Sequence, residues 1–256
     1  MNILQEIANR TKERIKARKK FFPIDKSQFT KCDFDFPFEA VLRSDDIAFI
    51  CEIKKASPSK GIIAENFDYL QIAKDYEAAG AAAISVLTEP YWFMGSDDYL
   101  REISGEVKTP LLRKDFTVDS YMIYEAKMIG ASAVLLICSV LDKNELAEYQ
   151  QIAHEIGLSV LVETHDEREV ETALSIGAKI IGVNNRNLKT FEVDLNLSER
   201  LRKLIPPDVI FVSESGITDA TGVQKLREIG ANAALIGESI MRSNDKKAAI
   251  KELRGY

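Results

Sequence analysis

The stretch AAGAAAISVL, residues 78–87, has the form that decides the fold. The same form returns as MIGASAVLLI (128–137), SIGAKIIGVN (175–184) and EIGANAALIG (228–237). Each copy indicates the last turn of a helix, a glycine in the left-handed conformation that ends it, and a short buried strand. The glycines of successive copies stand 50, 47 and 53 residues apart. That spacing is about twice the length of one strand-and-helix unit, so it predicts a further strand between each pair of copies.

Apolar runs stand at the places where these further strands are expected. Strands are predicted at residues 47–56, 110–116, 158–164 and 209–215. Amphipathic stretches of helical period separate the strands, including residues 67–79, 118–129, 142–156 and 166–176. Eight apolar strands that alternate with helices predict a closed (β/α)₈ barrel, a TIM barrel. An open doubly wound sheet is the structural alternative, but no G-x-G-x-x-G follows the first strand, which excludes its dinucleotide-binding form.

The first 45 residues lie outside the repeat. Residues 2–20 predict an extra helix, and residues 21–44 an aromatic-rich connection across one end of the barrel. We therefore expect one domain over residues 1–256, of which 1–45 is an N-terminal extension that caps the barrel. The basic run from Arg10 to Lys20 indicates a solvated helix face. The alternative is that this run folds over the barrel mouth and attracts an anionic substrate.

Composition excludes several classes of protein. With 46% hydrophobic and 29% charged residues, the chain has enough apolar residues for one large core, and disorder, collagen and coiled coils are excluded. No apolar run approaches the roughly 18–20 residues of a membrane span, and residues 1–20 are too charged for a secretory signal. We expect a cytoplasmic protein that binds no membrane. The net charge of −6 also argues against nucleic-acid binding.

The inventory of reactive side chains is narrow. The chain has two histidines, His154 and His165, and three cysteines at no metal-ligand spacing, so we expect no metal site. We assign neither histidine a role. Acid–base chemistry must therefore depend on carboxylates and lysines.

Charged residues end several of the predicted strands, and functional residues of such barrels gather there. Glu52 and Lys54 share parity, so both point inward. Four further polar ends are Arg113-Lys114-Asp115-Phe116, Glu163-Thr164-His165, Asn184-Asn185-Arg186 and Glu214-Ser215-Gly216. Solvated strand ends or a structural ion-pair layer is the alternative. Burying two lysines and three glutamates together costs several kcal/mol unless they pair, and such sites shift pKa values for acid–base work. A lysine beside other cations would lose basicity and donate a proton near neutrality.

Two further features suit a phosphorylated ligand with a planar ring. Glycine-bearing loops follow the seventh and eighth predicted strands, at residues 214–217 and 236–239, and such loops present backbone N–H groups to phosphate. The aromatic residues of 91–95, together with Phe116, could hold a ring. The polar loop 56–61 has the character of a mobile lid.

Five motifs resemble one known family, the indole-3-glycerol phosphate synthases of tryptophan biosynthesis. They are EIKKASPSKG (52–61), KDF (114–116), LVE (161–163), GVNNRNL (182–188) and ESGI (214–217), in family order over nearly the whole chain. The resemblance implies a lyase that converts 1-(2-carboxyphenylamino)-1-deoxyribulose 5-phosphate to indole-3-glycerol phosphate, with loss of carbon dioxide and water. It implies no cofactor and no metal. The first and fourth motifs separate this family from barrels that isomerise phosphoribosyl anthranilate or cleave indoleglycerol phosphate.

The resemblance also implies residue roles. Lys114 would be the general acid and Glu163 the general base. Lys54 would hold the substrate carboxylate, and Glu52 would assist proton transfer. The remaining implied residues are Asn184 and Ser215 for catalysis, Ser57, Phe93, Phe116, Leu135, Arg186, Leu188 and Glu214 for substrate binding, and Gly216, Gly237 and Glu238, with Ser57, for the phosphate.

Two other functions stay open at this point. One is a barrel that binds a phosphorylated ligand without turning it over, and the other is a related sugar-phosphate isomerase. The intact set of Lys54, Lys114 and Glu163 favours the lyase, because binding alone requires no acid and base. We expect a small phosphorylated molecule as the partner and a monomer in solution, with a homo-oligomer left open.

Overall fold

The structure is a computed structural model that describes residues 3–29, 35–187 and 190–255. Its helices are α1 (Ile3–Phe21), η1 (Lys26–Gln28), α2 (Pro37–Val41), α3 (Tyr69–Ala78), α4 (Asp97–Glu106), α5 (Tyr121–Met128), α6 (Lys143–Glu155), α7 (Glu167–Ser175), α8 (Asn196–Arg202), α9 (Ala220–Glu228), α10 (Glu238–Arg242) and α11 (Lys246–Arg254). Its strands are β1 (Ala48–Ile53), β2 (Ala56–Ser57), β3 (Gly61–Ile62), β4 (Ala83–Leu87), β5 (Leu111–Lys114), β6 (Ala133–Ile137), β7 (Ser159–Thr164), β8 (Ile180–Asn184), β9 (Ile210–Glu214) and β10 (Ala233–Ile236).

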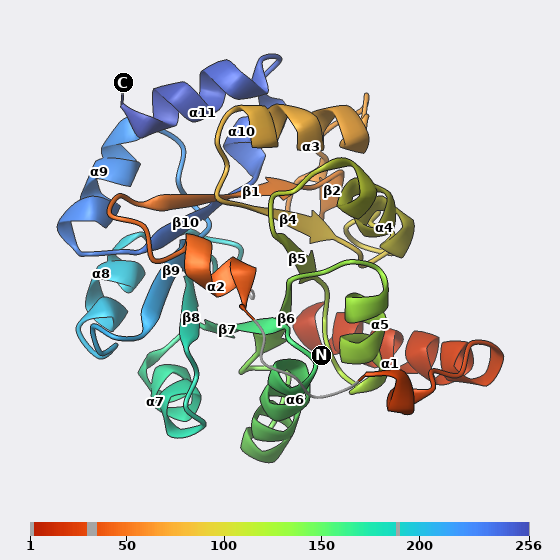
Figure 1. The fold of residues 1–256 in the computed structure, drawn as a ribbon. Helices are drawn as coiled ribbons and strands as arrows, with labels where there is room; N and C mark the ends of the chain where they lie inside the picture. The colour runs from red at the N-terminus through yellow and green to blue at the C-terminus, as the bar shows by residue number, and fades with distance from the viewer. Residues whose placement is uncertain (1–2, 30–34, 188–189, 256) are drawn as a thin grey trace.

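Eight strands close into a barrel in the order β1-β10-β9-β8-β7-β6-β5-β4. Every neighbouring pair in the barrel is parallel, and β1 closes it by pairing with both β10 and β4. Helices surround the strands on the outside (Figure 1). The predicted (β/α)₈ barrel is confirmed, and the open doubly wound sheet is excluded.

The glycines of the four repeated segments end helices as predicted. Gly80, Gly130, Gly177 and Gly230 all have φ between 72° and 91°, the left-handed region that a glycine adopts without steric cost. The first strand and the strands predicted at 110–116 and 209–215 are shorter than expected, since β1 ends at Ile53, β5 at Lys114 and β9 at Glu214. The polar residues beyond these strand ends belong to the loops that form the mouth of the barrel.

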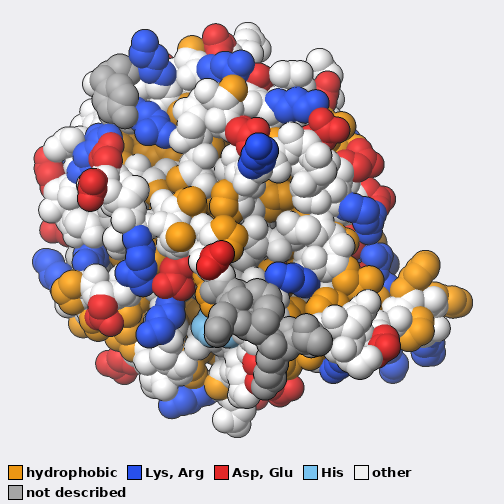
Figure 2. All heavy atoms as spheres, viewed as in Figure 1, with side chains coloured by type: hydrophobic (Ala, Val, Ile, Leu, Met, Phe, Trp, Pro, Cys, Tyr) orange, Lys and Arg blue, Asp and Glu red, His pale blue; other side chains and the backbone are white. Residues whose placement is uncertain are grey.

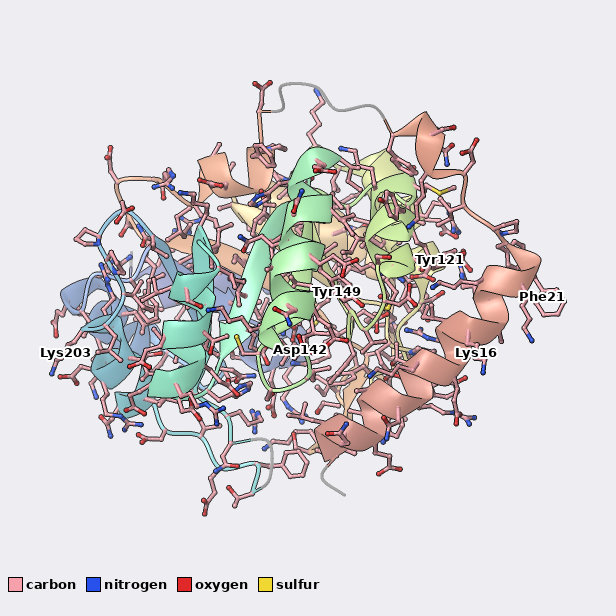
Figure 3. All side chains as sticks on the ribbon, turned by 90° about the horizontal axis from the view of Figure 1, so that it is seen from below. Lys16, Phe21, Tyr121, Asp142, Tyr149 and Lys203 are labelled. Atoms are coloured by element: carbon pink, nitrogen blue, oxygen red, sulfur yellow. The ribbon has the colours of Figure 1, made fainter. Side chains whose placement is uncertain are left out.

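The alternation of side chains along the strands divides the core in two. Phe49, Cys51 and Ile53 of β1 face outward into the layer between strands and helices, whereas Ile50 and Glu52 face into the barrel. The inner cluster extends beyond the barrel to Ile7 of α1. Phe38 and Leu42, in and just after α2, belong to the same cluster. Figure 3 shows α1 passing obliquely along one side, with Phe21 at its outer end, and α2 at the opposite end of the barrel.

The basic run of α1 is not simply a solvated face. Arg14 donates to both carboxylate oxygens of Asp115, at 3.1 and 2.9 Å, and Arg18 pairs with Asp97 and Glu125. The prediction of a solvated helix face is therefore wrong for Arg14 and Arg18, because carboxylates of the barrel attract these two guanidinium groups. The expected extra helix is present, and the division of the chain into one domain with a capping extension stays a prediction.

The remaining features of the fold concern membrane spans, surface charge and cysteines. Within the described residues, no helix combines the length and the apolar character that a membrane span requires. On the face shown in Figure 2, acidic and basic side chains are interspersed rather than separated into regions of one sign. Cys51 and Cys138 are free thiols, and Cys32 lies outside the described residues.

Candidate active site

The carboxyl ends of the strands open into a cavity of about 600 Å³. Every predicted site residue in the described part of the chain lines this cavity: Glu52, Lys54, Ser57, Phe93, Lys114, Phe116, Leu135, Glu163, Asn184, Arg186, Glu214, Ser215, Gly216, Gly237 and Glu238. Leu188 lies outside the described residues. Residues spread over most of the sequence meet here because parallel strands all end at one mouth.

Lys114 is the centre of the charged cluster. Its Nζ lies 3.1 Å from Oε2 of Glu163 and 3.2 Å from Oε2 of Glu214. Lys54 forms its own ion pair with Glu52, two residues earlier on the strand. All three glutamates are buried, so each lysine compensates carboxylates that have little access to water. The cluster is therefore a paired one, in which both signs of charge alternate.

The expected effect on lysine basicity is wrong for Lys114. Burial lowers the pKa of Lys114, but the charges of Glu163, Glu214 and Glu52 raise it by more, so that the net shift is upward. From the sequence, this lysine was expected beside other cations, whereas the structure surrounds it with carboxylates. Lys114 consequently carries its proton throughout the neutral range and is present in the form that an acid requires.

The two carboxylates on Lys114 differ in their proton affinity. Burial raises the pKa of Glu214 to about 7; Lys114 opposes this rise, and the charges of Glu163 and Glu52 add to it. Burial also acts on Glu163, but Lys114 and His165 outweigh it and lower the pKa of Glu163. Near neutrality Glu163 is thus an anion that can accept a proton, while Glu214 takes up a proton readily.

His165 is the residue that the sequence argument missed. Its Nε2 lies 3.3 Å from Oε1 of Glu163, and its Nδ1 lies 3.0 Å from Oε2 of Glu169. Burial lowers the pKa of His165, but these two carboxylates raise it to about 10. The signal available in the sequence was its position two residues after Glu163, at the end of β7 where the mouth lies.

Apolar groups form another wall of the cavity. The rings of Phe93 and Phe116 lie 6.4 Å apart between centroids and tilted by 39°. Leu135 of β6 belongs to the inner cluster below them. Glu89, which the sequence argument also missed, is buried and accepts the backbone N–H groups of residues 91, 92 and 93 at 2.7–3.1 Å. It thereby holds the loop that carries Phe93.

The loops after β9 and β10 form the opposite side. Ser215 and Gly216 have φ values of 67° and 85°, so the chain turns sharply directly after Glu214. A Cβ on Gly237 would lie 2.6 Å from Oε1 of Glu52, so only glycine fits there without displacing that carboxylate. Two cations line the same cavity, and both pair with Glu238: Arg242 at 3.1 Å and Lys60 at 3.7 Å.

Asn184 and Asn185, at the end of β8, point in different directions. Asn184 faces the cavity and accepts the backbone N–H of Arg186 at 3.1 Å. Asn185 points away and donates to Oγ of Ser213 and to the carbonyls of Glu214 and Ser215, at 3.0–3.1 Å. The buried amide therefore fixes the end of β9 that presents Glu214 and Ser215 to the mouth.

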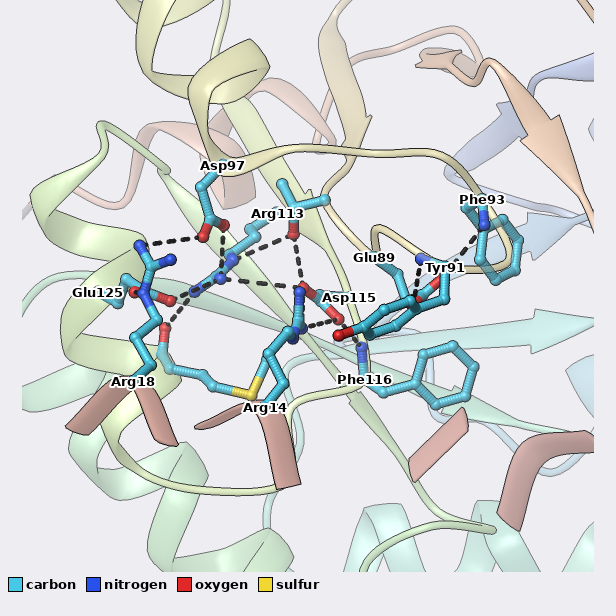
Figure 4. Close-up of polar contacts among 12 residues, drawn as sticks. Arg14, Arg18, Glu89, Tyr91, Phe93, Asp97, Arg113, Asp115, Phe116 and Glu125 are labelled. Atoms are coloured by element: carbon cyan, nitrogen blue, oxygen red, sulfur yellow. Dashed lines mark hydrogen bonds and ion pairs between the residues drawn. The ribbon is translucent and has the colours of Figure 1, made fainter. Parts of the chain in front are cut away.

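A second ion-pair network holds Arg113 and Asp115, the two residues that flank Lys114 in the sequence (Figure 4). The buried guanidinium of Arg113 lies 2.7 Å from Asp97 and 2.8 Å from Glu125. Asp115 lies 3.8 Å from the guanidinium of Arg113, and it accepts hydrogen bonds from Oγ1 of Thr88 and from the N–H of Phe116, both at 2.8 Å. The residues before and after Lys114 are thus both held by buried charges.

Across the ranges that the structure describes, no group of three or more histidine, cysteine, aspartate and glutamate side chains has an arrangement that could hold a metal ion.

Comparison with known proteins identifies the family of the chain. The family model described as indole-3-glycerol phosphate synthase matches residues 4–253. A protein of that name from Ruminiclostridium cellulolyticum is 57% identical over 99% of both chains. Relatives of the same name from Endomicrobium trichonymphae and Lachnoclostridium phytofermentans are 51% and 48% identical, and each alignment covers at least 98% of this chain.

Solved structures confirm the barrel at greater distance. A mutant tryptophan synthase α-subunit from Pyrococcus furiosus superposes with a TM-score of 0.64 over 82% of this chain and 99% of that one. A thiamine phosphate pyrophosphorylase from the same organism gives a TM-score of 0.60 over 82% and 94%. Both are 15% identical to this chain, so they bear on the fold alone. The match of the family model to nearly the whole sequence, and the identity to full-length relatives, show that the chain belongs to the indole-3-glycerol phosphate synthase family.

Proposed function

We propose that the charged mouth closes the indole ring with Lys114 as general acid and Glu163 as general base. Family membership makes the chain a carbon–carbon lyase of tryptophan biosynthesis that forms indole-3-glycerol phosphate. The observation that carries the residue roles is the pair itself. A protonated amine and an anionic carboxylate stand 3.1 Å apart in one cavity, each in the protonation state that its role requires.

The first step joins two carbon atoms. The aromatic carbon that bears the carboxylate attacks the carbonyl carbon of the deoxyribulose, and Lys114 donates its proton to the carbonyl oxygen. The ring then carries positive charge, spread onto the anilino nitrogen, and the anionic Glu163 stabilises it. Carbon dioxide leaves, and its bonding electrons restore the aromatic ring.

The second step removes water. The hydroxyl formed in the first step departs with a proton, and a carboxylate takes up the proton of the adjacent carbon as the double bond of the indole forms. Glu163 accepts this proton, Glu52 assists the transfer, and Lys54 acts on the departing hydroxyl. Because Lys54 and Glu52 form an ion pair at the end of β1, the group that acts on the hydroxyl and the group that assists the proton transfer are adjacent before substrate arrives.

Different residues bind the carboxylate, the benzene ring and the hydroxyl groups of the substrate. Lys54 binds the carboxylate that is lost, and Phe93, Phe116 and Leu135 hold the benzene ring. Asn184, Ser215, Arg186 and Glu214 orient the hydroxyl groups.

The phosphate binds beside Ser57, Gly216, Gly237 and the backbone of Glu238. Two cations that line this part of the cavity, Lys60 and Arg242, support that placement. The side chain of Glu238 is paired with Lys60 and Arg242, so its negative charge is compensated and repels the phosphate less.

One assay tests the function and the acid together. The purified protein is incubated with 1-(2-carboxyphenylamino)-1-deoxyribulose 5-phosphate, and indole fluorescence is followed. Lys114→Ala should lower kcat by about 10²–10⁴-fold with little change in KM, because a proton donor acts in the transition state. Lys74→Ala, at an exposed ion pair with Glu106, is the matched control and should retain full activity.

Two results would refute the proposal. No product from folded wild-type protein refutes the function, and near-normal turnover of Lys114→Ala refutes the acid. The Lys114→Ala substitution removes the cation that Glu163 and Glu214 share, and this loss could unfold the variant. Circular dichroism therefore establishes whether the variant is folded.

We further propose the setting in which the enzyme works. The chain acts as one domain with residues 1–45 as its capping extension, as a cytoplasmic monomer whose partner is the small phosphorylated substrate. Size-exclusion chromatography with light scattering tests the monomer.

A further inference from the structure

His165 lies directly behind the proposed base. It follows β7 and does not line the cavity, whereas Glu163 does. The ring lies between two carboxylates, with Nε2 3.3 Å from Glu163 and Nδ1 3.0 Å from Glu169. Glu169 also accepts the backbone N–H of His165 at 2.8 Å, so the residue is held at two points. This arrangement fixes the direction in which the imidazole faces.

Nε2 is the informative atom. It is buried, and it makes no well-aligned hydrogen bond within the described residues, so its attraction to Glu163 is mainly ionic. Glu163 in turn places its other oxygen, Oε2, against Lys114. The carboxylate of Glu163 therefore stands between two cations, Lys114 at the mouth and His165 behind it.

Further ionisable groups surround Glu163 and His165. Glu163 faces Lys114 of β5, Glu214 of β9 and the thiol of Cys138, and the ring of His165 faces Glu169 of α7. Asp166, the next residue after His165, directs its carboxylate to the start of α7, where it accepts the N–H of Glu169, and the ring nitrogens of His165 pair with Glu163 and Glu169 instead. His165 is thus the cation that faces Glu163 from the side opposite to the substrate cavity.

We propose that His165 is a positioning residue, an imidazolium held by Glu169 that keeps the Glu163 carboxylate anionic and turned with one oxygen toward Lys114. This inference rests on the proposed role of Glu163 as the base. The pKa shifts of the two residues agree with this role. The pKa of His165 is raised to about 10 although burial lowers it, and the pKa of Glu163 is lowered. Without His165, Lys114 alone would oppose the effect of burial on the pKa of Glu163, so that pKa would rise toward the protonated form, which cannot accept a proton.

The test is the pH profile of kcat/KM and kcat for a set of variants. His165→Gln places an amide nitrogen near the position of Nε2 but carries no charge. His165→Asn keeps a group near Nδ1 and removes the one near Glu163. His154→Gln, at the second histidine of the chain, which packs against Phe36 at the other end of the barrel, is the matched control.

The expected result is a pH-dependent loss. In His165→Gln the acidic limb should move up by about 1–3 pH units, the range of shifts that an opposite charge at this distance produces. Near pH 8, where Glu163 is again ionised, kcat should return to within a few-fold of wild type. KM should change little, because His165 does not line the cavity.

The remaining variants should behave differently. His165→Asn should lose kcat at every pH, since the orientation of Glu163 is lost as well. Glu169→Gln should move the acidic limb in the same direction as His165→Gln by a smaller amount. Substrate ionisation is common to all variants and cancels in the comparison.

Three results for His165→Gln would overturn the inference: an acidic limb that coincides with that of wild type, a loss of activity that is constant with pH, or an effect on KM alone. Glu163→Gln separates this failure from failure of the proposed base. If Glu163→Gln turns over at a near-normal rate, Glu163 is not the base; if it is inactive while the profile of His165→Gln is unchanged, only the role of His165 is refuted.

Discussion

Arg14 of α1 donates to both carboxylate oxygens of Asp115, a residue 101 positions away that directly follows Lys114. The side chain of Asp115 is fully buried, and that of Arg14 is 17% exposed. Ile3, Leu4 and Ile7, at the start of the same helix, line the substrate cavity. The ion pair thus connects the N-terminal helix with the strand end that carries the proposed acid.

Replacing Arg14 by methionine should loosen α1 and widen the mouth. We expect a loss of about 1–3 kcal/mol in the free energy of unfolding, because a buried carboxylate loses a charged partner. KM should rise several-fold while kcat falls less, since α1 contributes walls rather than reacting groups. Arg10→Met, on the exposed face of the same helix, is the control and should change stability by under about 1 kcal/mol. Equal effects of the two variants would contradict this role.

Gly182→Ala should displace Glu214. A Cβ on Gly182 would overlap with Oε1 of Glu214 and approach Leu161, so the glutamate must move away from Lys114. The variant should lose about 1–3 kcal/mol of stability, the usual cost of overpacking a core, and its kcat should fall by at least tenfold. Gly105→Ala, where a Cβ in α4 meets no atom within 4 Å, should instead be neutral or slightly stabilising. Urea unfolding and the fluorescence assay measure both effects, and unchanged activity of Gly182→Ala would refute the close fit.

Arg113→Met should be the most destabilising of these substitutions. It leaves Asp97 and Glu125 facing a buried apolar side chain, and removing one partner of a buried ion pair costs about 3–5 kcal/mol. Arg43→Met, at an exposed pair with Glu39, should cost under about 1 kcal/mol. The midpoints of urea denaturation compare the two, and similar midpoints would show that the network around Arg113 adds little to stability.

Glu214 should make stability depend on pH. Its pKa is raised from 4.5 to about 7 in the folded protein, chiefly by burial, so the folded state binds its proton more tightly than the unfolded state does. The stability that this provides is complete below about pH 4.5 and is lost as the pH rises through 7.

The Gln variant cannot ionise, so Glu214→Gln should gain stability relative to wild type between pH 5 and pH 8, on the order of 1–3 kcal/mol. Unfolding at a series of pH values measures the difference, with exposed Glu65→Gln in parallel as the reference for a lost surface carboxylate. A difference that stays constant or shrinks with rising pH would contradict the raised pKa of Glu214.

The sequence by itself determined the barrel and which residues meet at its mouth. Helix ends and strands that recur every 50 residues or so depend on local backbone preferences and on burial, both of which are written in neighbouring residues. The parity of Glu52 and Lys54 likewise follows from the period of a strand. Once the barrel is known, every strand end belongs to the same mouth, and this is why the charged residues at the strand ends could be predicted to meet in one cavity.

Only the tertiary structure decided which charges touch. Lys114 and Glu163 are 49 positions apart, and their contact depends on the order and register in which β5, β6 and β7 pair. The direction of the pKa shift of Lys114 could not be predicted, because it depends on the sign of the neighbouring charges, which here are carboxylates rather than cations. His165 was missed for the same reason. Its spacing from Glu163 is visible in the sequence, but the turn that brings its ring back against that carboxylate is set by Glu169 one helical turn later.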